Sequence, residues 1–202
     1  MYYNTITDHT LALLKSIQSI PELAELRLVG GTALALQIGH RMSIDLDLFG
    51  KWNYDDSLEP LLSRCGEVIL NNYQRKMQFF TINGIKTDFV EYDFPWIGQD
   101  IIQDGIRLAS IEDIGAMKIN AIINRGTKKD FIDLAFLLRD YNLATILDWY
   151  KTKYSSKNLA VALRSLVYFV DAEAMPMPKM IIPLKWDEAK SIVSKALRNY
   201  AL

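Results

Sequence analysis

The sequence has few of the residues on which several common sites depend. Its 202 residues include one cysteine, Cys65, and two histidines, His9 and His40. One cysteine excludes an internal disulfide and a cysteine-rich zinc site, and two histidines leave little for a serine–histidine triad. The glycine-rich P-loop and dinucleotide patterns, the HExxH zinc motif and the GxSxG nucleophile motif are also absent.

Long apolar runs are missing as well. The longest stretch without Asp, Glu, Lys or Arg is 13 residues, 28–40, whereas a helix needs about 20 residues to span a bilayer. The first residues show neither the basic nor the apolar region of a secretory signal. We therefore expect no membrane partner and a cytoplasmic location.

The two signs of charge nearly balance, but they are unevenly distributed. The formal net charge is −1, from 23 Lys and Arg against 24 Asp and Glu. Residues 118–164 hold nine basic and four acidic side chains, so that segment carries +5 and the rest of the chain −6. A basic segment of this kind is typical either of solvated helix faces or of a surface that meets phosphates.

Hydrophobic periodicity predicts two different halves. Over residues 1–109 we expect strands at 26–29, 43–49, 68–71, 78–82 and 85–92, with helices at 6–20, 32–38 and 55–65. From residue 110 onward we expect helices at 110–124, 127–141, 143–154, 157–170 and 186–202. The predicted organisation is an α/β half over 1–109 followed by an all-helical half over 110–202.

The stretch over residues 28–49 carries the most chemistry. Gly30 and Gly31 lie between a predicted strand and a predicted helix, where unpaired backbone N–H groups and the helix dipole favour a phosphate. Asp45 and Asp47 are two apart in a predicted strand, so their carboxylates point to the same face. Such like charges raise each other's pKa unless a cation lies between them. Mg²⁺ is the usual cation where phosphates complete the coordination.

Each part alone has a plainer explanation. A Gly–Gly pair is usually a turn, and a lone Asp-x-Asp on a strand is more often a solvated edge. The order of the parts is specific, however: a hydrophobic residue, Gly–Gly–Thr, a short helix, then Asp-x-Asp between apolar residues. This order resembles the signature of the DNA polymerase beta-like nucleotidyltransferase superfamily.

That superfamily uses a third carboxylate on a neighbouring strand. Asp88 is the candidate, on the return strand of a hairpin predicted at Asn83-Gly84. By the family pattern it is a general base or a second-metal ligand. Glu91, three positions further on, would point to the opposite face. The metal ligands and catalytic residues that the resemblance implies are Asp45, Asp47 and Asp88.

Three blocks in the right order resemble, more narrowly, the AbiEii/AbiGii toxin family of nucleotidyltransferases. They are residues 39–49, 110–125 and 128–134, within a match that covers about residues 26–140. The last sixty residues carry no motif that can be placed. The fold implied is α+β: a polymerase beta-like nucleotidyltransferase core with a mixed sheet over 1–109, followed by a C-terminal helical bundle over 110–202. The bundle would complete the cleft for nucleotide and acceptor.

The resemblance also implies a set of nucleotide-binding residues. By position they are Gly30, Gly31, Thr32, Arg41, Ser43, Lys118, Arg125 and Asp130, with Asp133 in the last motif. Part of this set has a structural alternative. Thr127 with Asp130 fits a capping box. Lys118 and Arg125, seven apart on one helix face, would also suit a solvated face.

The activity implied is Mg²⁺-dependent transfer of an NMP from an NTP to an acceptor hydroxyl, with two Mg²⁺ ions on the three carboxylates. In the resembling family the acceptor is RNA, including the tRNA 3′ end in some members. The proteins are toxins of toxin–antitoxin or phage-defence pairs. The expected partners are therefore an NTP, tRNA or another RNA, and a cognate antitoxin. The alternatives are a small-molecule acceptor such as an antibiotic, and a nucleotide-binding module without catalysis.

Overall fold

The computed structural model describes residues 1–52, 57–155 and 158–200. The chain folds into two compact units. Unit 1 comprises Met1–Asp93 and Gln99–Ala109, and unit 2 comprises Phe94–Gly98 and Ser110–Leu202. None of the helices in the described part of the chain is both long and apolar enough to cross a bilayer.

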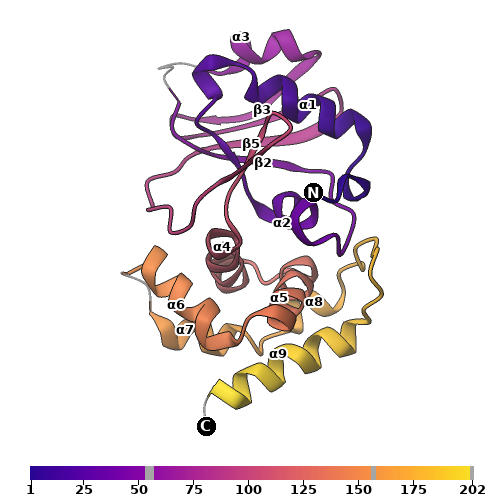
Figure 1. The fold of residues 1–202 in the computed structure, drawn as a ribbon, viewed down its shortest axis with the longest axis vertical. Coiled ribbons are helices and arrows are strands. Elements are labelled where there is room, and N and C mark those ends of the chain that lie inside the picture. Colours follow the sequence, from indigo (N-terminus) through magenta and orange to yellow (C-terminus); the bar gives the residue numbers. More distant parts are fainter. Residues whose placement is uncertain (53–56, 156–157, 201–202) are drawn as a thin grey trace. The chain divides into compact units, whose positions relative to one another are not determined.

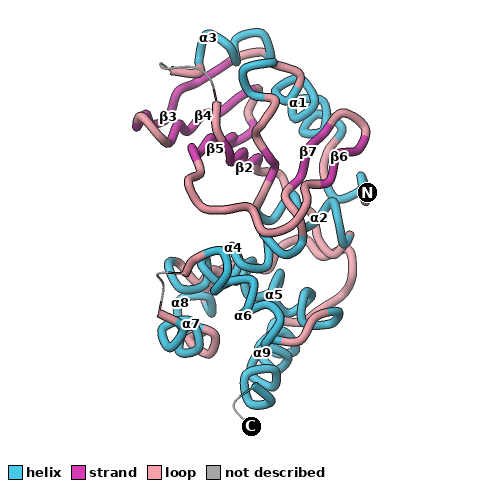
Figure 2. Tube along the Cα trace, turned by 60° about the vertical axis from the view of Figure 1, so that its left-hand side comes forward, coloured by secondary structure: helices cyan, strands magenta, loops and turns pink. Residues whose placement is uncertain are grey.

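Unit 1 combines a sheet with short helices (Figures 1 and 2). Its strands are β1 (Arg27–Leu28), β2 (Leu46–Gly50), β3 (Val68–Gln74), β4 (Met77–Ile82), β5 (Ile85–Glu91), β6 (Ile101–Gln103) and β7 (Ile106–Leu108). Its helices are α1 (Asp8–Gln18), α2 (Gly30–Ile38) and α3 (Glu59–Leu62), with 3-10 turns η1 (Tyr3–Thr5), η2 (Pro21–Leu23) and η3 (Ser63–Cys65).

The sheet is mixed. Its strand order is β3-β4-β5-β2-β1-β7-β6. The pairs β2–β5 and β1–β7 are parallel, and the other neighbouring pairs are antiparallel. This confirms the predicted mixed sheet. It also puts β2, which carries the second aspartate of the Asp-x-Asp motif, at the centre of the sheet, where neighbours on both sides hold its register.

Two sequence patterns explain the central strands. In β2, Leu46 and Leu48 are fully buried while Asp47 is partly exposed, as period-2 alternation predicts. Between β4 and β5, Asn83 and Gly84 both have positive φ, 50° and 78°, which is the conformation of a tight hairpin turn. The predicted hairpin is therefore confirmed, and it delivers β5 alongside β2.

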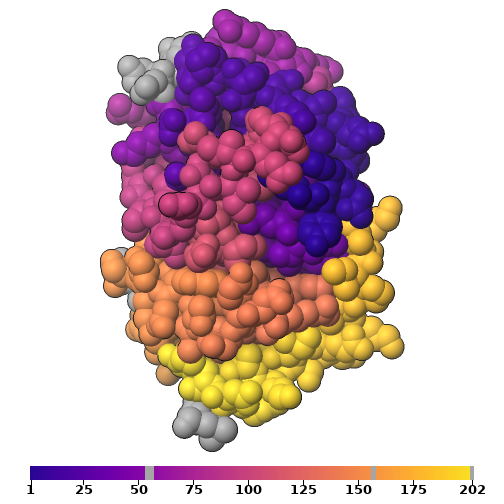
Figure 3. Space-filling model, in the orientation of Figure 1, coloured from indigo at the N-terminus to yellow at the C-terminus, as the bar shows by residue number. Residues whose placement is uncertain are grey.

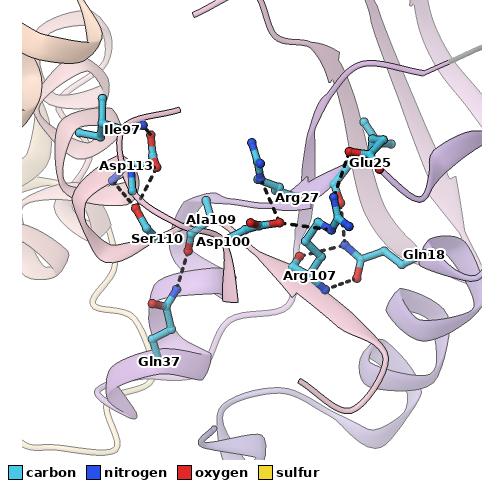
Figure 4. Close-up of polar contacts among 12 residues, drawn as sticks. Gln18, Glu25, Arg27, Gln37, Ile97, Asp100, Arg107, Ala109, Ser110 and Asp113 are labelled. Carbon is cyan, nitrogen blue, oxygen red and sulfur yellow. Dashed lines mark hydrogen bonds and ion pairs between the residues drawn. The ribbon is translucent and has the colours of Figure 1, made fainter. Parts of the chain in front are cut away.

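The hairpin of β6 and β7 lies outside the sequence prediction, which contains no strand between residues 92 and 110. Its turn is Asp104-Gly105, with φ of 54° and 79°, so the Asp-Gly pair was a usable hairpin signal. The side chain of Gln18 on α1 bonds both the N–H and the carbonyl of Arg107, at 2.8 and 2.9 Å (Figure 4). In Figure 3 the rose-coloured surface of residues 101–108 accordingly lies beside the indigo N-terminal residues.

Unit 2 is helical in the part of it that the structure describes. Its helices are α4 (Ile111–Asn124), α5 (Lys128–Asp140), α6 (Leu143–Lys153), α7 (Leu159–Ser165), α8 (Val170–Glu173) and α9 (Trp186–Tyr200). The single helix predicted over 157–170 is wrong: α7 ends at Ser165 and α8 starts at Val170. Residues 55, 56, 157, 201 and 202, at the ends of predicted helices, lie outside the described residues.

A buried carboxylate ties unit 2 together at the start of α4. The Ser110 hydroxyl caps the helix by accepting from the N–H of Asp113 at 3.1 Å. The Asp113 carboxylate accepts from the backbone N–H groups of Ile97 and Gly98, at 3.0 and 3.1 Å (Figure 4). It also pairs with Lys153 of α6 at 2.6 Å. Asp113 is therefore a structural residue that fixes the segment Phe94–Gly98 to two helices.

Candidate active site

The pairing of β2 with β5 brings two of the predicted carboxylates together. Asp47 and Asp88 are direct partners in the parallel register of these strands, so they lie on neighbouring strands at the same level. Asp45 lies one residue before β2 begins, not within the strand as predicted. Like Asp47 it is partly exposed, in contrast to the buried Leu46 between them. All three carboxylates belong to unit 1.

Gly30 packs against the Asp47 carboxylate and Gly31 against the Arg41 guanidinium. Gly30 has φ of +69° at the start of α2, a conformation that favours glycine. A Cβ atom at Gly30 would lie 2.3 Å from Oδ2 of Asp47. A Cβ atom at Gly31 would lie 2.1 Å from Nη2 of Arg41. The missing side chains therefore let the first turn of α2 approach the Asp47 carboxylate and the Arg41 guanidinium closely.

Thr32, Ser43 and Arg41 connect α2 to the segment before β2. Thr32 is in the first turn of α2, because this helix begins at Gly30 and not at residue 32 as predicted. Its hydroxyl is instead bonded to the Ser43 hydroxyl at 2.8 Å and to the Asp45 carbonyl. Arg41 is buried, and its Nη1 donates to the Met42 carbonyl at 3.0 Å. These contacts fix the backbone that carries Asp45.

Asp88 has two unlike oxygens. Its Oδ2 pairs with the ammonium of Lys86 at 2.9 Å. Its Oδ1 is buried and has no hydrogen-bond partner among the residues that the structure describes. A buried acceptor without a partner carries a desolvation cost, which a ligand bound to this oxygen would offset. Lys86, two positions before Asp88 and on the same face of β5, was not among the predicted site residues, although that even spacing was a usable signal.

The donor set suits a hard divalent cation. The three side chains offer carboxylate oxygens only, which Mg²⁺ and Mn²⁺ prefer, and the free Oδ1 of Asp88 is one of them. However, no three Asp, Glu, His or Cys side chains in the described residues are grouped closely enough to hold an ion as they stand. The residues therefore fit the metal in chemistry, while one oxygen of Asp88 is engaged by Lys86.

The remaining predicted residues form a separate cluster in unit 2. Lys118 on α4 is buried, and its ammonium contacts Asp130 at 3.0 Å and Asp133 at 2.6 Å. Arg125 holds Asp130 by two bonds, from Nε at 3.0 Å and from Nη2 at 3.1 Å. The Thr127 hydroxyl donates to Asp130 at 2.6 Å instead of capping the helix. The predicted role of Lys118, Arg125 and Asp130 in nucleotide binding stays a prediction.

The charges in this cluster shift the titration of Asp130. Burial alone would raise the pKa of its carboxyl, but the attraction of Lys118 and the bonds from Arg125 and Thr127 outweigh burial and lower the pKa to about 2. The carboxylate is therefore ionised at neutral pH, and it stabilises the pairing of α4 with α5.

Arg125 also lines a groove of about 320 Å³ on unit 2. The end of α4 and the two residues after it line the groove, and Arg164, Ser165 and Tyr168 are also among its lining residues. More than half of the Tyr168 side chain is exposed. Guanidinium groups bind phosphate and exposed aromatic rings stack on bases, although the carboxylate of Asp171 also lines the groove.

Comparison with known proteins identifies the family. Residues 12–194 match the family described as nucleotidyl transferase AbiEii toxin, type IV toxin–antitoxin system. The chain belongs to this family. It is therefore an AbiEii-type nucleotidyltransferase, as the sequence motifs predicted, and membership in a family of toxin–antitoxin toxins implies a nucleotide substrate and an antitoxin partner.

One sequence relative and two solved structures show how similar individual proteins are to this chain. An uncharacterized protein of Aquifex aeolicus (strain VF5), aq_aa25, is 32% identical over 194 residues, which is 93% of both chains. The crystal structure of JHP933 from Helicobacter pylori superposes with a TM-score of 0.59 at 18% identity, covering 96% of this chain and 92% of that one. MenT4, the nucleotidyltransferase toxin Rv2826c of Mycobacterium tuberculosis H37Rv, gives a TM-score of 0.59 at 14% identity, covering 93% and 80%. The predicted α+β nucleotidyltransferase fold is thus confirmed.

Proposed function

We propose that this AbiEii-type enzyme transfers an NMP from an NTP to a hydroxyl of an RNA acceptor, with tRNA as the first candidate, in a Mg²⁺-dependent reaction. The observation that carries the proposal is the register of β2 and β5, which sets Asp47 beside Asp88. Carboxylates on adjacent central strands, next to a glycine-lined helix start, suit a site that binds a metal–triphosphate group.

The chain's own residues have distinct roles in this proposal. Asp45, Asp47 and Asp88 would hold the metal, which when bound supplies charge stabilisation to the phosphates. The start of α2 has no side-chain cap, so its N–H groups at Gly30 and Gly31 would donate to phosphate oxygens. Thr32 and Ser43 would keep the Asp45 segment in place through their mutual hydrogen bond. Their shared work is positioning and charge stabilisation.

Other observations support the RNA acceptor and the antitoxin. The groove that Arg125, Arg164 and Tyr168 line has residue types that bind phosphates and bases. The basic surplus of residues 118–164 supports a polyanionic partner as well. MenT4, a fold neighbour, is named a nucleotidyltransferase toxin. We propose accordingly that the protein is a toxin restrained by a cognate antitoxin.

The test is direct incorporation of label. Purified protein with Mg²⁺ and one α-labelled NTP at a time is offered bulk tRNA, and products are resolved on a denaturing gel. We expect transfer from at least one NTP, reduced about a hundredfold or more in Asp45→Asn and Asp47→Asn. Asp93→Asn is the matched control, because Asp93 is an exposed carboxylate of unit 1 that pairs with Lys76.

The alternatives give different outcomes in the same assay. Label transferred to a mixture of small hydroxyl compounds, and not to RNA, would favour a small-molecule transferase. Binding of NTP without transfer to any acceptor would favour a module without catalysis. Either outcome would overturn the proposed RNA acceptor. Growth arrest on overexpression that a co-expressed neighbouring gene relieves would support the toxin–antitoxin part.

A further inference from the structure

The ammonium of Lys86 is a positive charge beside the candidate metal ligands Asp45, Asp47 and Asp88. It contacts Oδ2 of Asp88 at 2.9 Å. Lys86 and Asp88 are two positions apart on β5, and Asp88 is the register partner of Asp47 on β2. All three side chains therefore project from the same face of the sheet.

The same contact places positive charge beside the candidate carboxylates. Neighbouring carboxylates repel one another unless positive charge lies among them. In this structure Lys86 supplies that charge at Asp88, while the other oxygen of Asp88 has no hydrogen-bond partner within residues 1–52, 57–155 and 158–200. A divalent cation that binds Asp88 would meet an ammonium already bonded to one of its two oxygens.

We propose that Lys86 is a built-in counter-ion of the metal-binding carboxylates, which holds Asp88 when no divalent cation is bound and gives way when one binds. This inference rests on the metal-binding role of the carboxylates in the proposed function. Lys86 thereby stabilises the metal-free enzyme and lowers its affinity for the metal. Its side chain is 59% exposed, so the ammonium can move into solvent at little cost.

The chain offers a matched control for this proposal. Lys76 pairs with Asp93 at 2.7 Å and its side chain is 57% exposed, so it closely resembles Lys86 in contact and exposure. The charges that act on Lys76 are those of Asp93, Glu91 and Arg75, and not those of the candidate metal ligands. Lys76→Met therefore removes an ion pair of a similarly exposed lysine from the same unit, one whose partner, Asp93, is itself 59% exposed where Asp88 is 12% exposed.

The experiment is titration of metal-stripped protein with Mn²⁺, followed by electron paramagnetic resonance, without nucleotide or RNA. We expect Lys86→Met to bind Mn²⁺ about threefold or more tightly than wild type, because one repulsive charge is removed near the ion. Metal-free Lys86→Met should unfold at a lower temperature than metal-free wild type, and saturating Mn²⁺ should close that gap. Lys76→Met should bind Mn²⁺ as wild type does, and Lys86→Arg, which keeps the charge, should not gain affinity.

The contrary outcomes are distinct. Equal or weaker Mn²⁺ binding by Lys86→Met, with wild type binding normally, overturns this inference and leaves the proposed function standing. An equal gain of affinity in Lys76→Met overturns it too, because a general change of net charge would then explain the effect. Absence of Mn²⁺ binding in wild type overturns both the inference and the metal role of the carboxylates. Normal Mn²⁺ behaviour without RNA transfer contradicts only the proposed acceptor.

Discussion

At the scale of single residues, the close approach at Gly30 has the sharpest consequence. Gly30→Ala adds a methyl group that would lie 2.3 Å from Oδ2 of Asp47, so the carboxylate or the first turn of α2 must move. We expect nucleotidyl transfer to fall about tenfold or more, since small displacements of positioned groups are costly in catalysis. The measurement is the initial rate of label transfer, together with thermal unfolding.

Gly84→Ala separates this contact from backbone strain. Gly84 has a φ of +78°, close to the +69° of Gly30, but a Cβ there would meet no atom of the described residues within 4 Å. Both substitutions should cost about 1 kcal/mol or more of folding stability for the positive φ, and only Gly30→Ala should lose activity. A similar loss of activity in both would show that the contact with Asp47 has no special role.

The residues of the site differ in how far the sequence could predict them. Period-2 alternation and the Asn83-Gly84 turn were enough to predict that Asp88 returns on a strand. The sequence does not show which strand lies next to β5, and the register that sets Asp47 opposite Asp88 depends on that choice. The partners of Lys118 were unpredictable for a similar reason, because ion pairs between α4 and α5 depend on how the helices cross.

At the scale of elements, α4 and α5 are joined by the buried contacts of Asp130. Its pKa of about 2 lies below its ordinary value of 3.8, so the unfolded chain takes up this proton first as pH falls. The stability that the carboxylate contributes is fully present above about pH 4 and is lost progressively toward pH 2. Wild type should therefore lose folding free energy over this window, as followed by urea denaturation.

Asp130→Asn should remove that part of the pH dependence. At neutral pH it should cost roughly 3–5 kcal/mol, because Lys118 keeps a buried charge with one partner fewer. The control is Asp148→Asn on α6, where the Asp148 carboxylate is 68% exposed and pairs with Lys151; a change below about 1 kcal/mol is expected there. Equal pH profiles for Asp130→Asn and wild type would contradict the assignment.

Helices and strands were predictable where the local sequence pattern determines them. They were not predictable where pairing with a distant segment determines them. The helices α4 and α5 begin one residue after the predicted starts at residues 110 and 127. The strands β6 and β7 are only three residues each. Such short strands give no clear periodicity, and it is the pairing of β7 with β1 and the bonds from Gln18 that hold the hairpin. The Asp104-Gly105 turn was its one local signal.

At the scale of the whole molecule, the uneven charge predicts how RNA binding depends on salt. Residues 118–164 carry +5 although the chain carries −1. If that segment binds the acceptor, affinity for fluorescent tRNA should fall steeply as KCl rises from 50 to 200 mM. Binding releases counterions from the RNA, and this release is less favourable at higher salt concentration. Fluorescence anisotropy at several salt concentrations measures the slope of log affinity against log salt.

Two charge variants test which part of the chain causes the salt dependence of tRNA binding. Lys129→Gln removes an exposed charge within residues 118–164, and Lys195→Gln removes an exposed charge on α9 outside it. The slope of log affinity against log salt should become less steep by about one in Lys129→Gln. It should stay unchanged in Lys195→Gln. A slope near zero in wild type would contradict a polyanionic acceptor, and equal slopes in both variants would contradict the role of this segment.

The small segment Phe94–Gly98 has a consequence for how the protein is made. Because it belongs to unit 2 while Gln99–Ala109 belongs to unit 1, the polypeptide passes between the units three times. During synthesis, which proceeds from the N-terminus, this segment leaves the ribosome before Asp113 and well before Lys153, the residues that hold it. Unit 1 can close its sheet as soon as β7 emerges. A toxin assembled in this order carries its candidate carboxylates on a finished sheet while its helical unit is still incomplete.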